Sequence, residues 1–323
     1  MAGNNRCIWL AWEGHTRSRS LASELEIPLH EIIIKGNKIK RYIISLYKTA
    51  TVVKRYSPEI IFFQNPSIVL SVFLVLLRPF HKARLIMDTH NAGVYPLEGR
   101  NRILSWISYW LSRKVDLSIV TNEYLAKEVK RRRGSSYVLT DPIPKFPKYS
   151  RSSNELPEEV YVVLVCTWAD DEPYMEVISA AKILEEYDVN IHITGKPPKH
   201  VLEMSKPKNV VLEGFVSHEE YLALISDATL LIDLTSRENC LVCGAYEAAA
   251  VGTPCIISET DISKKVFKDG YLYTSNSAAD IARKIVIGLE RNSELRKQLV
   301  SFKLEYSKNF SNKIKDLALL TGV

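Results

Sequence analysis

Residues 230–254 read LLIDLTSRENCLVCGAYEAAAVGTP, which places an apolar run, a polar loop and an alanine-rich run in succession. The run Leu230–Leu234 has the length and aliphatic composition of a strand buried in a sheet. The polar loop Thr235–Asn239 follows it, and a helix is expected from about Cys240 to Val251. A strand that leads through a short loop into a helix is the repeating unit of a doubly wound α/β domain.

The same alternation extends along nearly the whole chain. In the first half it predicts strands at Cys7–Trp12, Leu29–Ile34, Glu59–Phe63, Ala83–Met87, Leu117–Val120 and Tyr137–Leu139. In the second half it predicts further strands at Val160–Cys166, Val189–Thr194, Asn209–Leu212, Cys255–Ser258 and Tyr271–Thr274. Helical periodicity lies between them, at Ser18–Leu25, Ile39–Tyr56, Ser67–Leu77, Arg102–Lys114, Glu123–Arg132, Tyr174–Tyr187, His218–Ile225 and Ile262–Phe267. Such short aliphatic runs are typical of strands buried on both faces of a parallel sheet.

A proline- and serine-rich segment separates the two halves. Residues 141–157 read DPIPKFPKYSRSSNELP, a composition typical of a linker. We therefore predict two Rossmann-like domains, residues 1–150 and 151–323, that face each other across a ligand cleft. A helical tail from Ala278 to about Leu320 is expected to pack back on the first domain.

Charge is divided unevenly between the halves, although the net charge is only +6. Residues 1–150 hold 24 Lys and Arg against 11 Asp and Glu, and the remainder is acidic. This predicts an anionic partner for the first domain, while an uneven solvated surface is the alternative. Five scattered cysteines and a start without a secretory signal predict a cytoplasmic chain.

The start of the helix near Cys240 is suited to a phosphate, because helix N-termini expose unpaired N–H groups at the positive end of the dipole. Glu238 precedes this helix and Glu247 lies two turns inside it. Two carboxylates so placed can accept hydrogen bonds from two sugars while the amides hold a diphosphate. The alternative is an acidic first turn that only stabilises the helix dipole.

These residues resemble the signature segment of the GT-B glycosyltransferases of family 4, the glycosyl transferases group 1. The run EAAAVGTP at 247–254 matches the second part of that signature. The first part departs from it, because eight residues rather than seven separate Glu238 from Glu247, and Cys240–Gly244 replaces a Gly-aromatic-Gly turn.

The resemblance implies transfer of a sugar from a nucleotide diphosphate-sugar, with retention and without a metal or other cofactor. Glu238 would contact the transferred sugar and Glu247 the ribose, with the base near Phe215 and Val216. The diphosphate would lie on the amides of Cys240, Leu241, Val242, Cys243 and Gly244.

The family carries an Arg and a Lys for the diphosphate after the first strand and helix of the second domain. Residues 166–173 here read CTWADDEP and contain no Arg or Lys. Lys196 or Arg237 would have to replace the missing pair. We expect Asp171 and Glu172 to cap the following helix rather than touch substrate.

In the first domain the turn after the first strand contains Gly14, His15, Arg17 and Arg19. The small Gly14 lets a ligand approach the backbone, and the three basic side chains suit an anionic ligand. The family has a His in the loop after the fourth strand, so His90 is the expected catalytic imidazole, with Asn91 on the acceptor side. A structural role for His90 is the alternative.

Other ligand classes are not indicated. Cys240 and Cys243 lack a second pair, which argues against zinc, and no Gly-x-Gly-x-x-Gly is present for a dinucleotide. No nucleic-acid motif is found. Aromatic and basic residues instead gather in 35–55, in 102–114 and at Lys130–Arg133. They favour peripheral contact with an anionic membrane at the inner face of the cell membrane. The acceptor is accordingly expected to be a sugar or a lipid-linked molecule. The rival functions are a nucleotide-sugar epimerase and a sugar-nucleotide-binding scaffold without catalysis.

Overall fold

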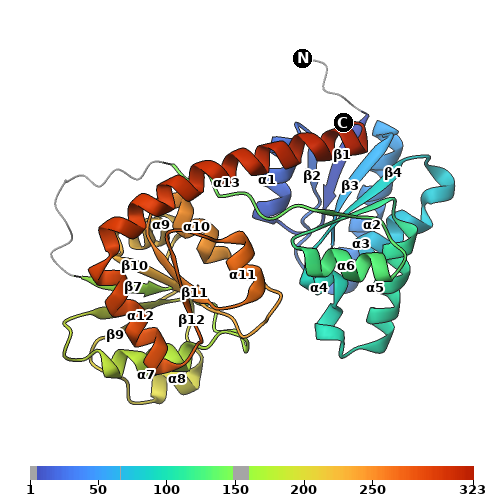
Figure 1. Ribbon diagram of the computed structural model, residues 1–323. Coiled ribbons are helices and arrows are strands. Elements are labelled where there is room, and N and C mark those ends of the chain that lie inside the picture. Colours follow the sequence, from blue (N-terminus) through green and yellow to red (C-terminus); the bar gives the residue numbers. More distant parts are fainter. Residues whose placement is uncertain (1–5, 66, 148–159) are drawn as a thin grey trace. The chain divides into compact units, whose positions relative to one another are not determined.

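The structure is a computed structural model that describes residues 6–65, 67–147 and 160–323. The chain forms two compact units, which are residues 1–142 with 309–323, and residues 143–308 (Figure 1). The division therefore falls at Pro142, where the sequence placed it at 150. Residues 148–157 of the expected linker lie outside the described residues.

A parallel sheet with the order β2-β1-β3-β4-β5-β6 forms the centre of the first unit. Its strands are β1 (Cys7–Ala11), β2 (Leu29–Glu31), β3 (Ile60–Asn65), β4 (Arg84–Thr89), β5 (Leu117–Val120) and β6 (Ser136–Val138). Trp9 of β1 stacks on Phe62 of β3 with ring centroids 5.3 Å apart, and both are fully buried. This burial on both faces explains why the strands read as unbroken apolar runs.

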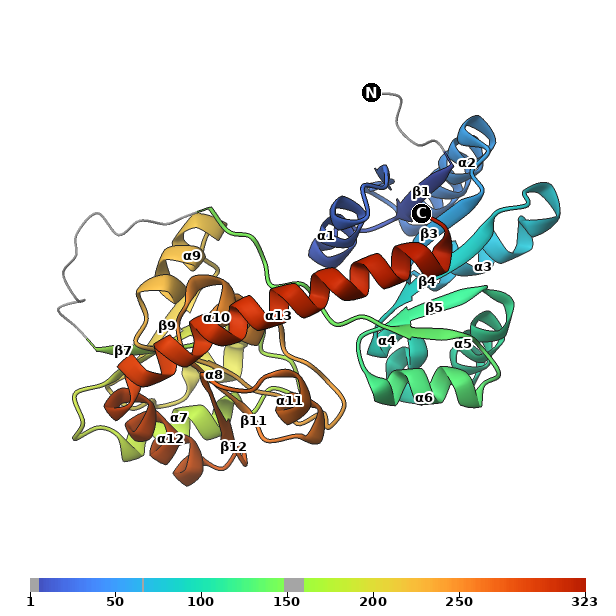
Figure 2. The same cartoon turned by 45° about the horizontal axis from the view of Figure 1, so that its top comes forward.

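The helices of the first unit connect these strands. They are α1 (Thr16–Glu24), α2 (Lys38–Tyr56), α3 (Ile68–Leu76), α4 (Asn91–Val94), α5 (Arg102–Lys114) and α6 (Glu123–Arg131), with the short 3-10 helices η1 (Arg78–Phe80) and η2 (Pro96–Gly99). Val53, Leu74 and Leu111 bring α2, α3 and α5 into one apolar cluster with Ile61 and Leu85 of the sheet. These three helices therefore cover the same face of the sheet (Figure 2).

The second unit repeats this plan around a parallel sheet with the order β12-β11-β10-β7-β8-β9. Its strands are β7 (Tyr161–Leu164), β8 (Asn190–Thr194), β9 (Val210–Gly214), β10 (Leu230–Asp233), β11 (Cys255–Ser258) and β12 (Tyr271–Thr274). Its helices are α7 (Tyr174–Ile183), α8 (Lys199–Glu203), α9 (His218–Asp227), α10 (Cys243–Val251), α11 (Asp261–Val266) and α12 (Ala278–Glu290). All strand pairs are parallel, so the loops that follow the strands lie at one edge of the sheet.

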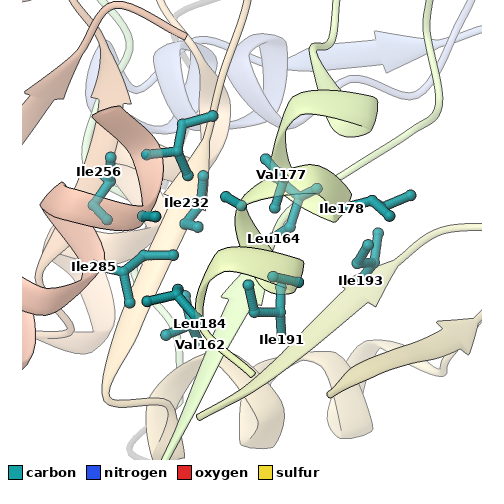
Figure 3. Close-up of a cluster of buried hydrophobic side chains, with 14 of the residues drawn as sticks. Val162, Leu164, Val177, Ile178, Leu184, Ile191, Ile193, Ile232, Ile256 and Ile285 are labelled. Carbon is teal, nitrogen blue, oxygen red and sulfur yellow. The ribbon is translucent and has the colours of Figure 1, made fainter. Parts of the chain in front are cut away.

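The core of the second unit is aliphatic (Figure 3). Ile191 and Ile232 of the sheet pack against Val177 of α7 and Ile285 of α12, and none of these side chains is exposed. Each such burial contributes about 1.5–3 kcal/mol relative to exposure in water. The packing fixes the strands, and thereby the loops at their carboxyl ends.

The last helix, α13 (Asn292–Thr321), contributes to both units. In the second unit Arg296 donates to the carbonyl oxygens of Gly252 and Ala228, each at 2.9 Å. In the first unit Tyr137 donates to the carbonyl oxygen of Lys313 at 2.7 Å. Residues 309–323 thus pack with the first unit, as the domain division implies.

The structure contains every predicted strand, with ends shifted by up to three residues, and corrects several helix predictions. The helix expected near Cys240 begins at Cys243, because no side chain caps it earlier. The expected tail is two helices that meet at Arg291. The short helices α4 and α8 were missed because four or five residues show too little periodicity.

Candidate active site

The loop between β10 and α10 starts directly after Asp233, whose carboxyl group is buried. Asp233, the last residue of β10, accepts a hydrogen bond from the backbone N–H of Gly244 at 2.6 Å. A side chain at Gly244 would collide with this group, since a Cβ there would lie 2.6 Å from Asp233 Oδ2. Asp233 therefore caps α10 from the strand, and it takes one of the amides that the resemblance assigns to the diphosphate.

The environment of Asp233 favours its neutral form. Burial raises the pKa of its carboxyl well above the ordinary value, and the charges of Glu247, Glu172 and Asp171 act in the same direction. The hydrogen bond from Gly244 opposes this shift. Asp233 is not among the site residues predicted from the sequence, although an acidic residue that ends the apolar run LLID is a visible signal.

Glu247 lies on α10 and faces α9. The hydroxyl of Tyr221 on α9 donates a short hydrogen bond to Glu247 Oε2. Burial raises the pKa of Glu247, while this hydrogen bond and the nearby His218 act against the rise. The Tyr221 hydroxyl thus holds the Glu247 side chain in one orientation.

The loop before α10 is tied to the loop after β7 through Asp171. The Asp171 carboxylate accepts from the hydroxyl of Thr235 at 2.7 Å and pairs with Arg237 at 3.2 Å. Glu238 follows and is exposed to solvent. Arg237 is therefore near the site but already engages a carboxylate.

The prediction that Asp171 and Glu172 cap the following helix is wrong, because Pro173 occupies the cap position of α7. Glu172 instead accepts from the backbone N–H groups of Thr167 and Ala169 and fixes its own loop.

Lys196 and Phe215 follow two neighbouring strands of the same sheet. Gly195 and Gly214, which precede them, pair with each other, so both side chains start from adjacent positions. Lys196 is exposed, and Phe215 is 89% exposed. Val216 beside it is half-buried.

In the first unit the predicted turn after β1 meets the loop after β4. The rings of His15 and His90 lie with centroids 5.2 Å apart. His90 Nε2 is 4.0 Å from Asp88, and His15 Nδ1 accepts from the N–H of Arg17 at 3.2 Å. Burial lowers the pKa of His90, and the positive charge of Arg17 adds to this effect.

Arg17, expected to face an anionic ligand, is buried among protein acceptors. Its guanidinium pairs with Asp88 at 3.0 Å and Asp141 at 2.8 Å, and donates to the carbonyl oxygen of Leu139 at 2.8 Å. Burial alone would raise the pKa of Asp141, but the charge and hydrogen bond of Arg17 together with the nearby His90 and His15 outweigh this and lower it. Arg17 thus ties the strand ends together, a contact that sequence spacing could not reveal.

The remaining residues predicted in this loop region have different surroundings. Arg19 pairs with Glu31 at 2.8 Å on the surface, and Gly14 lies close to the Arg19 guanidinium. Asn91 begins α4 directly after His90. The structure therefore brings His15, His90 and Asn91 together and directs Arg19 to another partner.

Three further observations bear on the chemistry. In the part of the chain that the structure describes, no group of three His, Cys, Asp or Glu residues is arranged to hold a metal ion. None of the cysteines among the described residues forms a disulfide. No helix among the described residues is both long enough and apolar enough to traverse a bilayer.

Solved structures with the same architecture identify the class of fold. HepE of Anabaena, in complex with UDP-glucose, has a TM-score of 0.72 at 11% identity, with 98% of each chain covered. Sucrose-phosphate synthase of Thermosynechococcus elongatus has a TM-score of 0.73 at 14% identity, again with 98% of each chain covered. A putative UDP-N-acetylglucosamine 2-epimerase of Listeria monocytogenes has a TM-score of 0.63 at 10% identity, covering 95% of this chain and 94% of the other. At such identities the likeness concerns the fold, and it confirms the predicted GT-B class.

Residues 146–304 match the model of the family described as glycosyl transferases group 1. The match spans 159 of the 323 residues, just under half of the chain, and lies within the second unit. No curated protein matches the chain at the level of sequence.

Proposed function

We propose that the protein transfers a sugar from a nucleoside diphosphate-sugar, most favourably a UDP-sugar, to a lipid-linked acceptor at the cytoplasmic face of a membrane. The observation that carries the donor assignment is the start of α10, where the cap residue Val242 provides no side-chain hydrogen bond to the first turn. The positive end of the helix dipole there is left available to an external anion.

Three groups would position the donor around that point. Glu247, oriented by Tyr221, would accept from the ribose hydroxyls. Phe215, which is almost fully exposed, offers an apolar surface for the base. Lys196 would approach the diphosphate, while Arg237 first has to exchange its partner Asp171. The complexes of HepE with UDP-glucose and with UDP support a uridine nucleotide.

The reaction would proceed by positioning and by stabilisation of the leaving diphosphate, without a resident metal. Glu238 would contact the transferred sugar. His90, whose lowered pKa favours the neutral imidazole, would accept a hydrogen bond from a hydroxyl of the sugar. Retention of anomeric configuration follows from the family resemblance. Addition of EDTA should leave the rate unchanged, and a loss of activity would contradict metal independence.

Two other functions make different predictions for the same site. An epimerase would convert a UDP-sugar alone, and the Listeria structure has the same fold. A binding scaffold would hold the nucleotide without turnover. Incubation with UDP-sugar and no acceptor separates them, because the epimerase forms a second UDP-sugar, the scaffold changes nothing, and a transferase releases at most traces of UDP.

The donor assignment is tested by thermal shift with UDP, GDP, ADP and TDP, since a ligand that binds only the folded state raises the melting temperature. We expect UDP to give the largest shift. The variant Glu247→Ala should abolish that shift without unfolding the protein. Glu238→Ala should keep the shift and lower turnover of the sugar donor. A wild-type shift in Glu247→Ala would contradict the ribose assignment.

A further inference from the structure

One surface of the first unit lacks acidic side chains. It consists of the outer sides of α2, α3, η1 and α5, none of which contains Asp or Glu, and we call it the α2–α3–α5 face. The helices lie one after another along one face of the sheet (Figure 2). Exposed cations on it include Lys40, Lys48, Lys54, Arg55, Arg102 and Arg113.

Large apolar side chains are exposed among these cations. On α2 the residues Ile39, Ile43 and Tyr47 recur every four positions and form a stripe that is exposed at 71%, 61% and 73%. Trp106 on α5 and Phe80 in η1 are exposed at 65% and 85%. A helix that buries one apolar side in the core normally presents polar residues outward, so a second apolar stripe indicates a second partner.

The acidic residues at the margin of this face do not cancel its charge. Glu59 pairs with Arg6 at 2.7 Å, and Asp116 pairs with Arg78 at 2.6 Å. Each carboxylate is thus matched by an arginine. The lysines of α2 have no acidic residue on their own helix, so the face as a whole remains positive.

A pocket opens on the same face between the end of α2 and η1. Its volume is about 590 Å³, within the range of ligand sites. Val53, Leu77 and Phe80 form apolar walls, and the charged lining consists of Lys54, Lys82 and Glu59, whose carboxylate pairs with Arg6. Apolar walls beside ammonium groups suit an amphiphile with an anionic head.

We infer that the α2–α3–α5 face docks on an anionic phospholipid bilayer, with the pocket receiving part of one lipid. Aromatic and aliphatic side chains between lysines match the boundary between headgroups and acyl chains. Nucleic acid would satisfy the lysines but offers no apolar layer to the isoleucine stripe. A second copy of the chain docked through the same face would place lysines against lysines.

The basic run Lys130–Arg133, which the sequence suggested as part of a membrane surface, is excluded from this face. Arg131 and Arg132 both pair with Glu128 at 2.8 Å, and Arg132 is buried. Glu128 and Glu123 also place negative charge on α6. This helix therefore supplies a control surface in the same unit.

Cosedimentation with vesicles tests the charge of the face. The variant K40Q/K48Q/K54Q removes three exposed cations from α2, and K127Q/K130Q/R133Q removes three exposed cations from α6 and its end. We expect wild type to bind phosphatidylglycerol vesicles at low salt, to leave them at 1 M salt and to ignore phosphatidylcholine. The α2 variant should bind at least tenfold more weakly than the α6 variant. Equal weakening in both variants, or no vesicle binding by wild type, overturns the inference.

Trp106 provides a direct reporter of contact, because among the described residues it is the tryptophan with a largely exposed side chain. Phosphatidylglycerol brominated on its acyl chains should quench the fluorescence of wild type. The variant Trp106→Phe should still bind vesicles but lose most of that quenching. Equal quenching in the two proteins would place another tryptophan at the membrane and overturn the assignment.

Because the inference rests on the proposed function, in which the acceptor is lipid-linked, the two need separate readouts. The α2 variant should keep the full thermal shift with UDP. A protein that binds UDP but no vesicles refutes the docking face and leaves the donor assignment intact. A protein that binds vesicles but no nucleotide refutes the donor assignment alone. In the absence of lipid, a dimer that I43S/W106S dissociates would assign the face to a second copy instead.

Discussion

Both units place carboxyl groups at the carboxyl ends of their central strands, but they stabilise them in different ways. In the first unit Asp88 and Asp141 share the buried guanidinium of Arg17, at 3.0 and 2.8 Å. In the second unit Asp233 is buried, as Asp88 is, and it accepts a hydrogen bond from the N–H of Gly244; it forms no ion pair among the described residues. In the first arrangement the carboxylates serve as structural ties, and the pKa of Asp141 is lowered. In the second arrangement burial raises the pKa of Asp233, whose carboxyl group holds the first turn of α10 through Gly244.

The largest effect is expected from removal of the buried cation. Arg17→Leu leaves the buried Asp88 and the partly buried Asp141 without their partner. Breaking one side of a buried ion pair destabilises a protein by about 3–5 kcal/mol. Urea unfolding, followed by fluorescence and by hydrogen exchange in β1 and β4, should show this loss in the first unit.

A matched control and a rescue distinguish this explanation from simple loss of packing. Arg19→Leu removes an exposed pair with Glu31 and should cost at most about 1 kcal/mol. Adding Asp88→Asn to Arg17→Leu removes one unpaired charge and should restore part of the stability. An equal loss in the single and double variants would contradict the electrostatic account.

The next-largest effect is expected in the second unit, where α10 closely approaches β10. Gly244→Ala places a Cβ within 2.6 Å of Asp233 Oδ2 and should cost about 1–3 kcal/mol. Because the clash involves one side chain, Asp233→Ala combined with Gly244→Ala should cost less than the sum of the two single changes. Strict additivity in chemical denaturation would show that the glycine is needed for another reason.

The contrast between the units also predicts opposite dependences on pH. The native pKa of Asp233 lies above the ordinary 3.8, so the native state keeps a proton that the unfolded chain releases, and wild type loses stability as the pH rises. The side chain in Asp233→Asn cannot ionise. The melting temperature of this variant relative to that of wild type should therefore rise between pH 4 and pH 8.

The pKa of Asp141 lies below 3.8, so the carboxylate stabilises the native state above that pH and loses this effect as the pH falls. Asp141→Asn should therefore be less stable than wild type at pH 7, with the difference shrinking toward pH 3. Melting curves with the same sign for both variants would contradict the comparison.

The sequence predicts the two sheets well for a definite physical reason. Strands buried on both faces must be short and aliphatic, and runs such as 60–63 and 230–233 show this without any long-range information. The first residue of a helix is harder to predict from the sequence when the side chain that caps the helix is distant in sequence. Asp233 caps α10 from ten residues upstream, so no local signal marks Cys243 as the first helical residue.

In the candidate site, too, the sequence predicts residues that have a local pattern but not the contacts between distant residues. Glu247 is recognisable because the alanine-rich run after it has a distinctive pattern, and His90 because it follows a strand. The partner of Arg17 could not be predicted, since Asp88 and Asp141 lie 71 and 124 residues away in sequence. Likewise Tyr221 contacts Glu247 across two neighbouring helices, which only the packing of α9 on α10 reveals.

The smallest effect concerns one hydroxyl in each unit. Tyr221→Phe removes the donor to Glu247, and Tyr137→Phe removes the donor to the carbonyl oxygen of Lys313. Each should cost about 0.5–1.5 kcal/mol, the usual net value of a hydrogen bond. Only Tyr221→Phe should weaken binding of UDP, because the bond from Tyr221 lowers the pKa of Glu247 and fixes its orientation. Without it the carboxylate is more readily protonated, so the loss of affinity should grow as the pH falls. Titration calorimetry at two pH values measures this, and equal affinities for the two variants would mean that Tyr221 serves stability alone.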